Sequence, residues 1–264
     1  MTAATPDGRR PWLLVLDTAT SRVVVAAAAL DGTLLGATTW VAGRTHGERL
    51  LPAIGRLHGE ANLRRSRIRG VIVGTGPGAF TGLRVGLATA KAIAHELAVP
   101  IVGVSTGEAL IRGAVEAGEA REVGNSGEAG KARDAGDPRD PGRPLADATT
   151  PEERIVLLLP AGPNDRHQVR TGLAPELLPG GIEPALAAHE ILVAVDLAAR
   201  APDDAVDRGE RARERLAAGL AAIGAARLEA HQPDDLARLV PEYVTLPRGV
   251  SAERGEVAWS RDPR

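Results

Sequence analysis

A glycine-rich segment, residues 74–86, is the part of this sequence whose residue types and spacing most suggest chemistry. It reads Gly-Thr-Gly-Pro-Gly-Ala-Phe-Thr-Gly-Leu-Arg-Val-Gly and lies between an expected strand and an expected helix, where free backbone N–H groups could hold an anion. It lacks the Gly-x-x-x-x-Gly-Lys-Ser/Thr spacing of a Walker phosphate-binding loop. Thr81 also stands where the dinucleotide-binding motif has a glycine. Alternatively, Gly82, Gly86 and Ala90 form a small-residue helix face for close packing, and their four-residue spacing favours this interpretation.

Ser105 is a candidate nucleophile because it lies in a Gly-x-Ser-x-Gly pattern between an expected strand and an expected helix. Asp196 or Asp204, followed by His231, would complete a hydrolase triad in the required chain order. The alternative is a structural role, in which Ser105 caps the next helix and Glu108 completes a capping box. No His-Gly-Gly oxyanion segment accompanies the pattern, which favours the cap.

Balanced charge and the absence of cysteine exclude several classes of function. The 264 residues include 32 Lys and Arg against 34 Asp and Glu, so no global cationic field favours tight nucleic-acid binding. Without cysteine, disulfides, thiolate nucleophiles and Cys-based metal sites are excluded. The histidines lack metal-ligand spacing, and His46 is expected at a helix start or an interface. No secretory leader or membrane-spanning run is recognised, so we expect a cytoplasmic protein that binds no membrane, metal or cofactor.

The first hundred residues show the clearest periodicity. Apolar runs separated by turns predict an antiparallel meander of three strands, and two amphipathic helices then alternate with two further strands. The resulting order, β-β-β-α-β-α-β, matches the ribonuclease-H-like core of actin-like proteins, an α/β fold. The expected elements are strands 12–17, 23–30 and 33–41, helix 46–61, strand 68–73, helix 80–97 and strand 101–104.

The rest of the chain is less regular. Residues 116–150 contain almost no large aliphatic side chains, so we expect a disordered insertion there. Strands are expected at 154–159, 168–171 and 191–195, and a helix at 213–230. The predicted organisation is an N-terminal lobe at 1–110, a helix end and insertion at 111–153, a C-terminal lobe with a closing helix at 154–247, and a flexible tail at 248–264.

Several segments of the N-terminal part resemble the bacterial TsaB family, also called YeaZ. They are the glycine-rich segment, Thr-His-Gly-Glu-Arg-Leu-Leu-Pro at 45–52, Ala-Thr-Ala-Lys-Ala at 88–92, Leu-Asp-Thr-Ala-Thr at 16–20 and Pro-Ile-Val-Gly-Val-Ser at 100–105. Pro-Glu-Tyr-Val at 241–244 is loosely similar to the family's Pro-x-Tyr-Leu element. The resemblance covers about residues 12–110. The second lobe diverges, because Pro160 stands where the family has an Asp after the strand.

This resemblance implies an actin-like ATPase fold of two lobes and a role without catalysis. In the TsaB family the partner TsaD transfers a threonylcarbamoyl group to the adenosine beside the anticodon of ANN-decoding tRNAs, and the ATPase TsaE joins the assembly. The chain is therefore expected to be a scaffold subunit that binds and activates TsaD and meets tRNA indirectly. Family members also pair with themselves when alone, which implies a homodimer in the absence of TsaD.

The two expected helices of the first lobe are the candidate partner surface. The stripe Arg84, Lys91 and His95 on the second helix is either a solvated face or a contact for a partner or tRNA. The predicted partner-interface residues are His46, Leu50, Leu51, Ile54, Gly82, Leu83, Arg84, Gly86, Leu87 and Ala90.

Asp17 is the candidate remnant of a nucleotide site. Actin-fold ATP hydrolysis needs a carboxylate–Mg²⁺ platform in both lobes and a glycine turn at the phosphates. Here Ala19 replaces the usual glycine, and Pro160 occupies the second-lobe position. A structural role for Asp17 in a turn is therefore favoured over nucleotide binding. A free-standing actin-fold ATPase and the Ser105 hydrolase remain the alternative functions.

Overall fold

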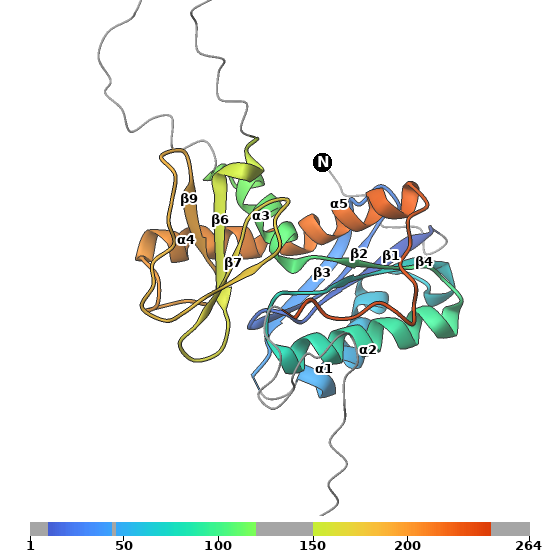
Figure 1. Ribbon diagram of the computed structural model, residues 1–264. Coiled ribbons are helices and arrows are strands. Elements are labelled where there is room, and N and C mark those ends of the chain that lie inside the picture. The colour runs from blue at the N-terminus through green and yellow to red at the C-terminus, as the bar shows by residue number, and fades with distance from the viewer. Residues whose placement is uncertain (1–9, 44–45, 120–149, 244–264) are drawn as a thin grey trace, which may run out of the picture.

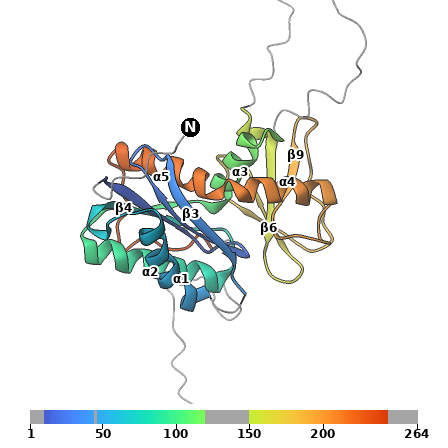
Figure 2. The same cartoon turned by 180° about the vertical axis from the view of Figure 1, so that it is seen from behind.

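A computed structural model describes residues 10–43, 46–119 and 150–243 of the chain. Two lobes, each built on its own mixed sheet, lie side by side (Figure 1, Figure 2). The predictions about residues 120–149 and 248–264 lie outside the described residues. Within the described ranges, no helix has the length and apolar character that a membrane crossing requires.

The first lobe contains a five-stranded sheet in the order β3-β2-β1-β4-β5. The central strand β1 (Trp12–Asp17) pairs antiparallel with β2 (Arg22–Ala28) and parallel with β4 (Ile68–Gly74). All six residues of β1 are buried, because helices cover both faces of the sheet and the strand is apolar throughout. The edge strands are β3 (Leu34–Val41) and β5 (Ile101–Val104), so every strand predicted in this lobe is present.

Three helices cover the first sheet. Helices α1 (His46–Glu60) and α2 (Phe80–Leu97) lie on one face, and α5 (Leu216–Glu229) lies on the other (Figure 1). The sequence grouped the closing helix with the second lobe, but α5 packs against β1, β4 and β5 of the first. Gly224 allows this approach, since a Cβ atom there would stand 2.6 Å from the Ile72 side chain.

The second lobe has a four-stranded sheet in the order β8-β7-β6-β9. Helix α3 (Thr106–Glu116) packs against β6 of this sheet, and helix α4 (Asp203–Glu214) packs against β9. The sequence predicted neither α4 nor β8. Only Ala205, Gly209 and Ala212 of α4 are buried, so the helix carries no large apolar stripe. The strands are β6 (Ile155–Pro160), β7 (Arg166–Val169), β8 (Glu176–Leu178) and β9 (Ile191–Ala194).

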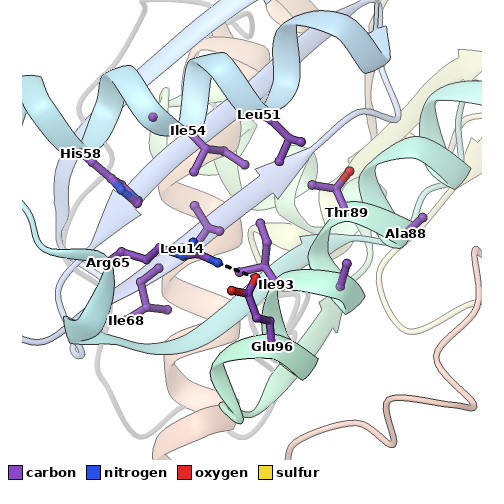
Figure 3. Close-up of a pocket in the computed structure, with 12 residues that line it drawn as sticks. Leu14, Leu51, Ile54, His58, Arg65, Ile68, Ala88, Thr89, Ile93 and Glu96 are labelled. Carbon is purple, nitrogen blue, oxygen red and sulfur yellow. Dashed lines mark hydrogen bonds and ion pairs between the residues drawn. The ribbon is translucent and has the colours of Figure 1, made fainter.

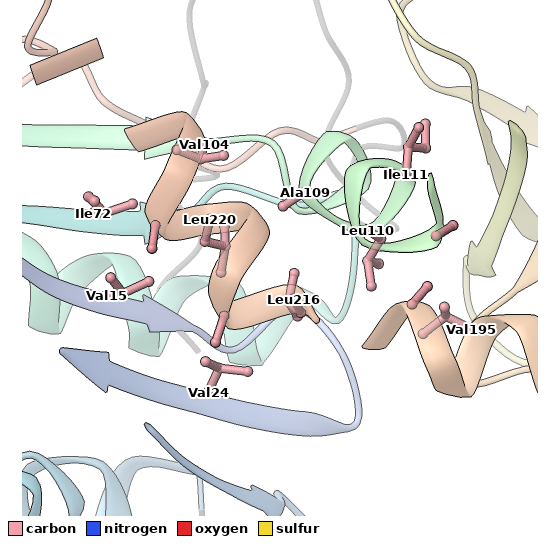
Figure 4. Close-up of a cluster of buried hydrophobic side chains, with 14 of the residues drawn as sticks. Val15, Val24, Ile72, Val104, Ala109, Leu110, Ile111, Val195, Leu216 and Leu220 are labelled. Carbon is pink, nitrogen blue, oxygen red and sulfur yellow. The ribbon is translucent and has the colours of Figure 1, made fainter. Parts of the chain in front are cut away.

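One hydrophobic cluster connects the two lobes. Leu216 and Leu220 of α5 lie between Val24 of the first sheet and Leu110 of α3, and Val195 reaches the same cluster from the second lobe (Figure 4). Because this cluster contains side chains from both sheets, the lobes share a continuous apolar contact instead of meeting only through a linker.

Candidate functional site

A groove of about 690 Å³ runs between α1 and α2 on the face of the first lobe opposite α5 (Figure 3). Leu50 of α1 points into the core and is 1% exposed, whereas its neighbour Leu51 faces the groove and is 62% exposed. The lining is mostly aliphatic and small: Leu14, Leu51, Ile54, Gly55, His58, Arg65, Ile68, Ala88, Thr89, Ala92, Ile93 and Glu96.

One end of this α1–α2 groove is polar. Arg65, in the short 3₁₀ turn Arg65–Arg67, forms an ion pair with Glu96 of α2 (Figure 3). His58 stands edge-on to the ring of Trp12, with the ring centroids 5.1 Å apart. Burial, and secondarily the charge of Arg65, lowers the pKa of His58, so its imidazole is neutral at pH 7.

Seven of the predicted interface residues are buried within the chain: Leu50, Ile54, Gly82, Leu83, Gly86, Leu87 and Ala90. The loop after β1 packs directly against these glycines of α2, since a Cβ atom at Gly86 would stand 2.1 Å from Thr18 Oγ1. The Thr18 hydroxyl also donates to the Gly82 carbonyl at 2.7 Å. Close packing at these glycines is therefore intramolecular.

The other three predicted interface residues lie in different surroundings. Leu51 is exposed and lines the groove together with the buried Ile54, whereas Arg84 lies outside the groove. His46 begins α1, but the structure does not describe its side chain. The prediction missed the groove residues Ala88 and Ala92, because exposed alanines on a helix carry no hydropathy signal that separates them from a solvated face.

The basic stripe on α2 holds the chain's own C-terminal strap, residues 232–243 (Figure 1). Lys91 Nζ donates to the carbonyls of Ala237 and Leu239, at 3.3 and 3.1 Å. Arg84 lies 3.9 Å above the ring of Phe80 and donates to the Tyr243 hydroxyl. These two cations therefore have intramolecular partners.

Ser105 does not meet the other members of the hypothetical triad. Its hydroxyl donates to the Gly76 carbonyl at 3.2 Å and accepts from the Glu108 amide at 3.4 Å, so the predicted helix cap is confirmed. Asp196 accepts hydrogen bonds from Ser21, and His231 Nδ1 contacts the Glu229 carbonyl. The other candidate acid, Asp204, pairs with Arg208.

Asp17 is fully buried and has only intramolecular partners. Its carboxylate accepts from the Ala19 amide at 2.9 Å and from the Thr106 hydroxyl at 2.7 Å. A Cβ atom at Gly74 would stand 1.8 Å from Asp17 Oδ2, so only glycine fits above it. Burial raises the pKa of Asp17 to about 6, although the bonds from Thr106 and Ala19 act in the opposite direction. The bond to Thr106 links the end of β1 to the start of α3, and the bond to the Ala19 amide lies in the turn after β1. Both contacts favour a structural role for Asp17 over nucleotide binding.

A second cavity of about 560 Å³ lies between the lobes. It is lined by the loop after β1 and the start of α2 from the first lobe, and by residues 159–162, His167 and Asp196 from the second lobe. Asp17 is not among its lining residues. Across the ranges that the structure describes, no three His, Asp or Glu side chains are grouped as a metal site would require.

Two lobes on mixed sheets, with α5 crossing behind the first, define an α/β protein of the actin-like ATPase fold. The solved structure of YeaZ from Pseudomonas aeruginosa superimposes with a TM-score of 0.58 at 22% identity, covering 88% of this chain and 99% of that one. The predicted fold class is thereby confirmed.

The sequence similarity to known proteins lies mainly in the first lobe. A family model described as TsaD, tRNA N6-adenosine threonylcarbamoyltransferase, matches residues 35–123. The tRNA threonylcarbamoyladenosine biosynthesis protein TsaB of Haemophilus influenzae is 34% identical over 113 residues, 41% of this chain and 45% of its own length. An uncharacterized protein of Mycobacterium leprae is 42% identical over 102 residues, 37% of this chain and 28% of its own. The chain thus spans less than half the length of these relatives, and the resemblance to the TsaB family is confirmed.

Proposed function

We propose that this protein is a non-catalytic scaffold subunit for threonylcarbamoyl transfer to the adenosine beside the anticodon of ANN-decoding tRNAs. In this proposal it binds and activates TsaD through the α1–α2 groove. TsaE joins the assembled complex, and the chain associates with tRNA only indirectly. The observation that carries the proposal is the apolar groove itself. It lies within residues 14–96, in the lobe whose sequence is similar to TsaB.

The groove has the shape and chemistry that a partner helix needs. Leu51 exposes a large apolar side chain to solvent, and Ala88 and Ala92 present only methyl groups on the α2 side of the groove. Gly55 lines the groove, and a Cβ atom there would meet nothing within 4 Å in the described chain. A helix with an apolar stripe can therefore approach α1 closely at this residue and bury Leu51.

The candidate chemical groups support a scaffold role because they are engaged structurally. Ser105 caps α3, and Asp17 is buried beneath Gly74. The proposal accordingly assigns no catalytic residue and no cofactor to this chain, and the TsaD partner performs the transfer.

Leu51→Glu tests the proposal, with Leu177→Glu as its matched control. Both leucines are exposed, but Leu177 lies on β8 of the second lobe, far from the groove. We expect Leu51→Glu to keep the wild-type melting temperature, to lose co-purification with TsaD and to stop tRNA modification in a reconstituted assay. Leu177→Glu should retain both co-purification with TsaD and tRNA modification.

The same assay separates the scaffold from an enzyme. Purified chain without TsaD is expected to form no threonylcarbamoyladenosine and to hydrolyse no ATP. Transfer by the chain alone would show that it is itself a transferase, the activity named by the family model that matches residues 35–123. Unchanged TsaD binding by Leu51→Glu would place the partner surface elsewhere.

A further inference from the structure

A basic turn adjoins the polar end of the α1–α2 groove, and from it we infer that the partner helix in the groove is flanked by an acidic segment. The basic turn comprises residues 64–69, which read Arg-Arg-Ser-Arg-Ile-Arg. This inference rests on the proposed function and deepens it, because it names the chemistry by which TsaD is recognised beside the apolar contact.

The charge of the basic turn contrasts with that of the whole chain. Residues 56–69 contain five arginines and one glutamate, whereas the whole chain has a formal net charge of −2. Three of the four arginines of the turn are exposed, and Arg67 is half-buried. Arg65 pairs with Glu96, but in the described part of the chain no carboxylate lies within ion-pair distance of the other three. The fold therefore leaves a local excess of positive charge here, which attracts an anionic partner.

The backbone of the basic turn is fixed by hydrogen bonds. The indole of Trp12, on the buried strand β1, donates to the Arg64 carbonyl at 2.9 Å, and the Arg67 amide donates to the same carbonyl at 2.9 Å. Arg69 donates to two carbonyls of the turn itself, at 3.1 and 3.0 Å. Cations on a fixed backbone lose less conformational entropy on binding than cations on a mobile loop, which favours a specific contact.

The basic turn is continuous with the groove. Arg65 and Ile68 line the groove, and Figure 3 shows them beside Glu96 at its polar end. A helix that buries Leu51 and lies along the groove reaches Arg65 at this end. The Arg65–Glu96 pair is largely exposed, with 52% and 63% of the two side chains accessible, so a carboxylate of the partner can displace Glu96 at little cost.

An acidic protein segment fits this surface better than a nucleic acid does. Arginine donates two parallel hydrogen bonds to a carboxylate, and a helix with aspartate or glutamate beyond its apolar stripe presents both groups that the surface requires. A phosphate backbone also pairs with arginine, but it carries no apolar stripe that could bury Leu51. RNA binding at the basic turn is therefore an outcome that the test must separate.

The double variant Arg64→Glu/Arg67→Glu tests the inference through the rate of association with TsaD. The full chain is bound to immobilised TsaD at about 50 mM and about 300 mM salt. We expect the variant to associate about tenfold more slowly at the lower salt and about twofold more slowly at the higher, with a smaller change in the dissociation rate, as for charges at the rim of an interface. If the double reversal lowers the melting temperature, Arg64→Gln/Arg67→Gln replaces it and should show a smaller change in the same direction.

Arg112→Glu/Arg215→Glu is the matched control. It makes the same charge change at exposed positions on α3 and at the start of α5, away from the groove, and should associate like the wild type at both salt concentrations.

Glu96→Gln sharpens the test, because it removes the carboxylate that competes for Arg65 while keeping the shape of the side chain. We expect this variant to associate about two- to threefold faster than the wild type at the lower salt. A pair with only a structural role predicts no such gain.

The inference is overturned if the arginine variants associate like the wild type, or if Glu96→Gln brings no gain. It is also overturned if the arginine variants leave the kinetics with TsaD unchanged but weaken tRNA binding by the assembled complex, since the basic turn then contacts RNA. Leu51→Glu separates this inference from the proposed function. If Leu51→Glu still binds TsaD, both are overturned, whereas loss of binding by Leu51→Glu with unaffected arginine variants overturns the inference alone.

Discussion

The two lobes bury their sheets in different ways. In the first lobe, helices cover both faces, and the cluster that includes Trp12, Leu14 and Leu16 lies beneath α1 and α2. In the second lobe, the corresponding outer face has only a small cluster, which includes Val156 and Leu158. The central strands β1 and β6 are apolar and almost wholly buried, whereas the edge strand β8 is short and largely exposed because less of its sheet is covered.

Arginines compensate for the small apolar cluster of the second lobe. Arg166 is 3% exposed and donates to the carbonyls of Ile182 and Arg200. Arg200 in turn donates to the carbonyls of Gly162 and Asp165, at 3.1 and 2.8 Å. The loops of this lobe are thus fixed by hydrogen bonds from side chains to the backbone. Such contacts depend on individual residues and leave little periodic pattern in a sequence.

Truncating one buried leucine in each lobe should show the largest difference. Leu16 and Leu158 are both fully buried. We expect Leu16→Ala to lower the free energy of unfolding by about 3–5 kcal/mol, and Leu158→Ala by about 2–3 kcal/mol, because a smaller cluster collapses more easily around the cavity. Urea unfolding monitored by circular dichroism measures both. An equal or larger loss for Leu158→Ala would show that the second lobe is packed as tightly as the first.

Asp17 gives the first lobe a distinctive pH dependence. Its carboxyl has a pKa of about 6 in the folded protein against an ordinary value of 3.8, so the folded state binds its proton more tightly. The contribution of this group to stability is complete below pH 3.8, falls as the pH rises toward 6 and is absent above that. The full difference is about 3 kcal/mol at ~1.4 kcal/mol per pKa unit.

Asp17→Asn removes this titration while keeping the shape of the side chain. We therefore expect the variant to gain stability relative to the wild type on passing from pH 4 to pH 7, measured by urea unfolding at both values. Asp31→Asn, at an exposed turn, is the control and should show no such gain. A relative loss on the same passage would mean that the buried carboxyl is ionised favourably in the fold.

The pair of Arg170 and Glu190 tests whether ionic contacts hold the second lobe. Their side chains are 23% and 10% exposed and lie 2.9 Å apart, and Arg170 also donates to the Ala185 carbonyl. Arg170→Met should lower the free energy of unfolding by about 1–2 kcal/mol. The exposed pair of Arg112 and Glu116 is the matched control, and Arg112→Met should cost about 0.5 kcal/mol or less.

The pH dependence of this pair is opposite to that of Asp17. Hydrogen bonding to Arg170 lowers the pKa of Glu190, so its stabilising effect is present above the ordinary value of 4.5 and is lost as the pH falls. The difference between wild type and Arg170→Met should therefore shrink at pH 3. A difference that stays constant with pH would point to lost packing of the arginine stem instead.

The same contrast explains how much the sequence could predict. The buried first-lobe strands β1, β2, β4 and β5 were predictable because they are mainly apolar runs bounded by turns. The half-exposed β3 was predictable because a turn separates it from β2. The helix stripes of α1 and α2 were visible through their apolar periodicity. Helix α4 and strand β8 were not, since their few buried residues are small or only partly apolar.

Within the candidate site, the sequence predicted that helices α1 and α2 exist but could not assign their faces. Leu50 and Leu51 are adjacent and chemically identical, and only the position of the sheet makes one core and the other surface. Likewise, the strap that engages Arg84 and Lys91 is more than 130 residues away in the chain, so no local pattern reveals it.

The C-terminal strap provides the smallest expected effect and a last contrast between the lobes. It runs beside the edge strand β5, where Asp234 accepts from the Gly103 amide, and no comparable segment crosses β8 in the described chain. Lys91→Met removes two hydrogen bonds to the strap, so we expect a loss of about 1 kcal/mol or less in global stability. The local effect should be larger: the amide of Glu242, which donates to the Thr75 carbonyl, should exchange with deuterium faster, while the amides of β1 keep their protection. Ala92→Met, on the groove side of α2, is the control and should leave the exchange of Glu242 unchanged. If Lys91→Met instead accelerates exchange across the whole first lobe, the strap is part of the lobe's cooperative core and not a separately opening segment.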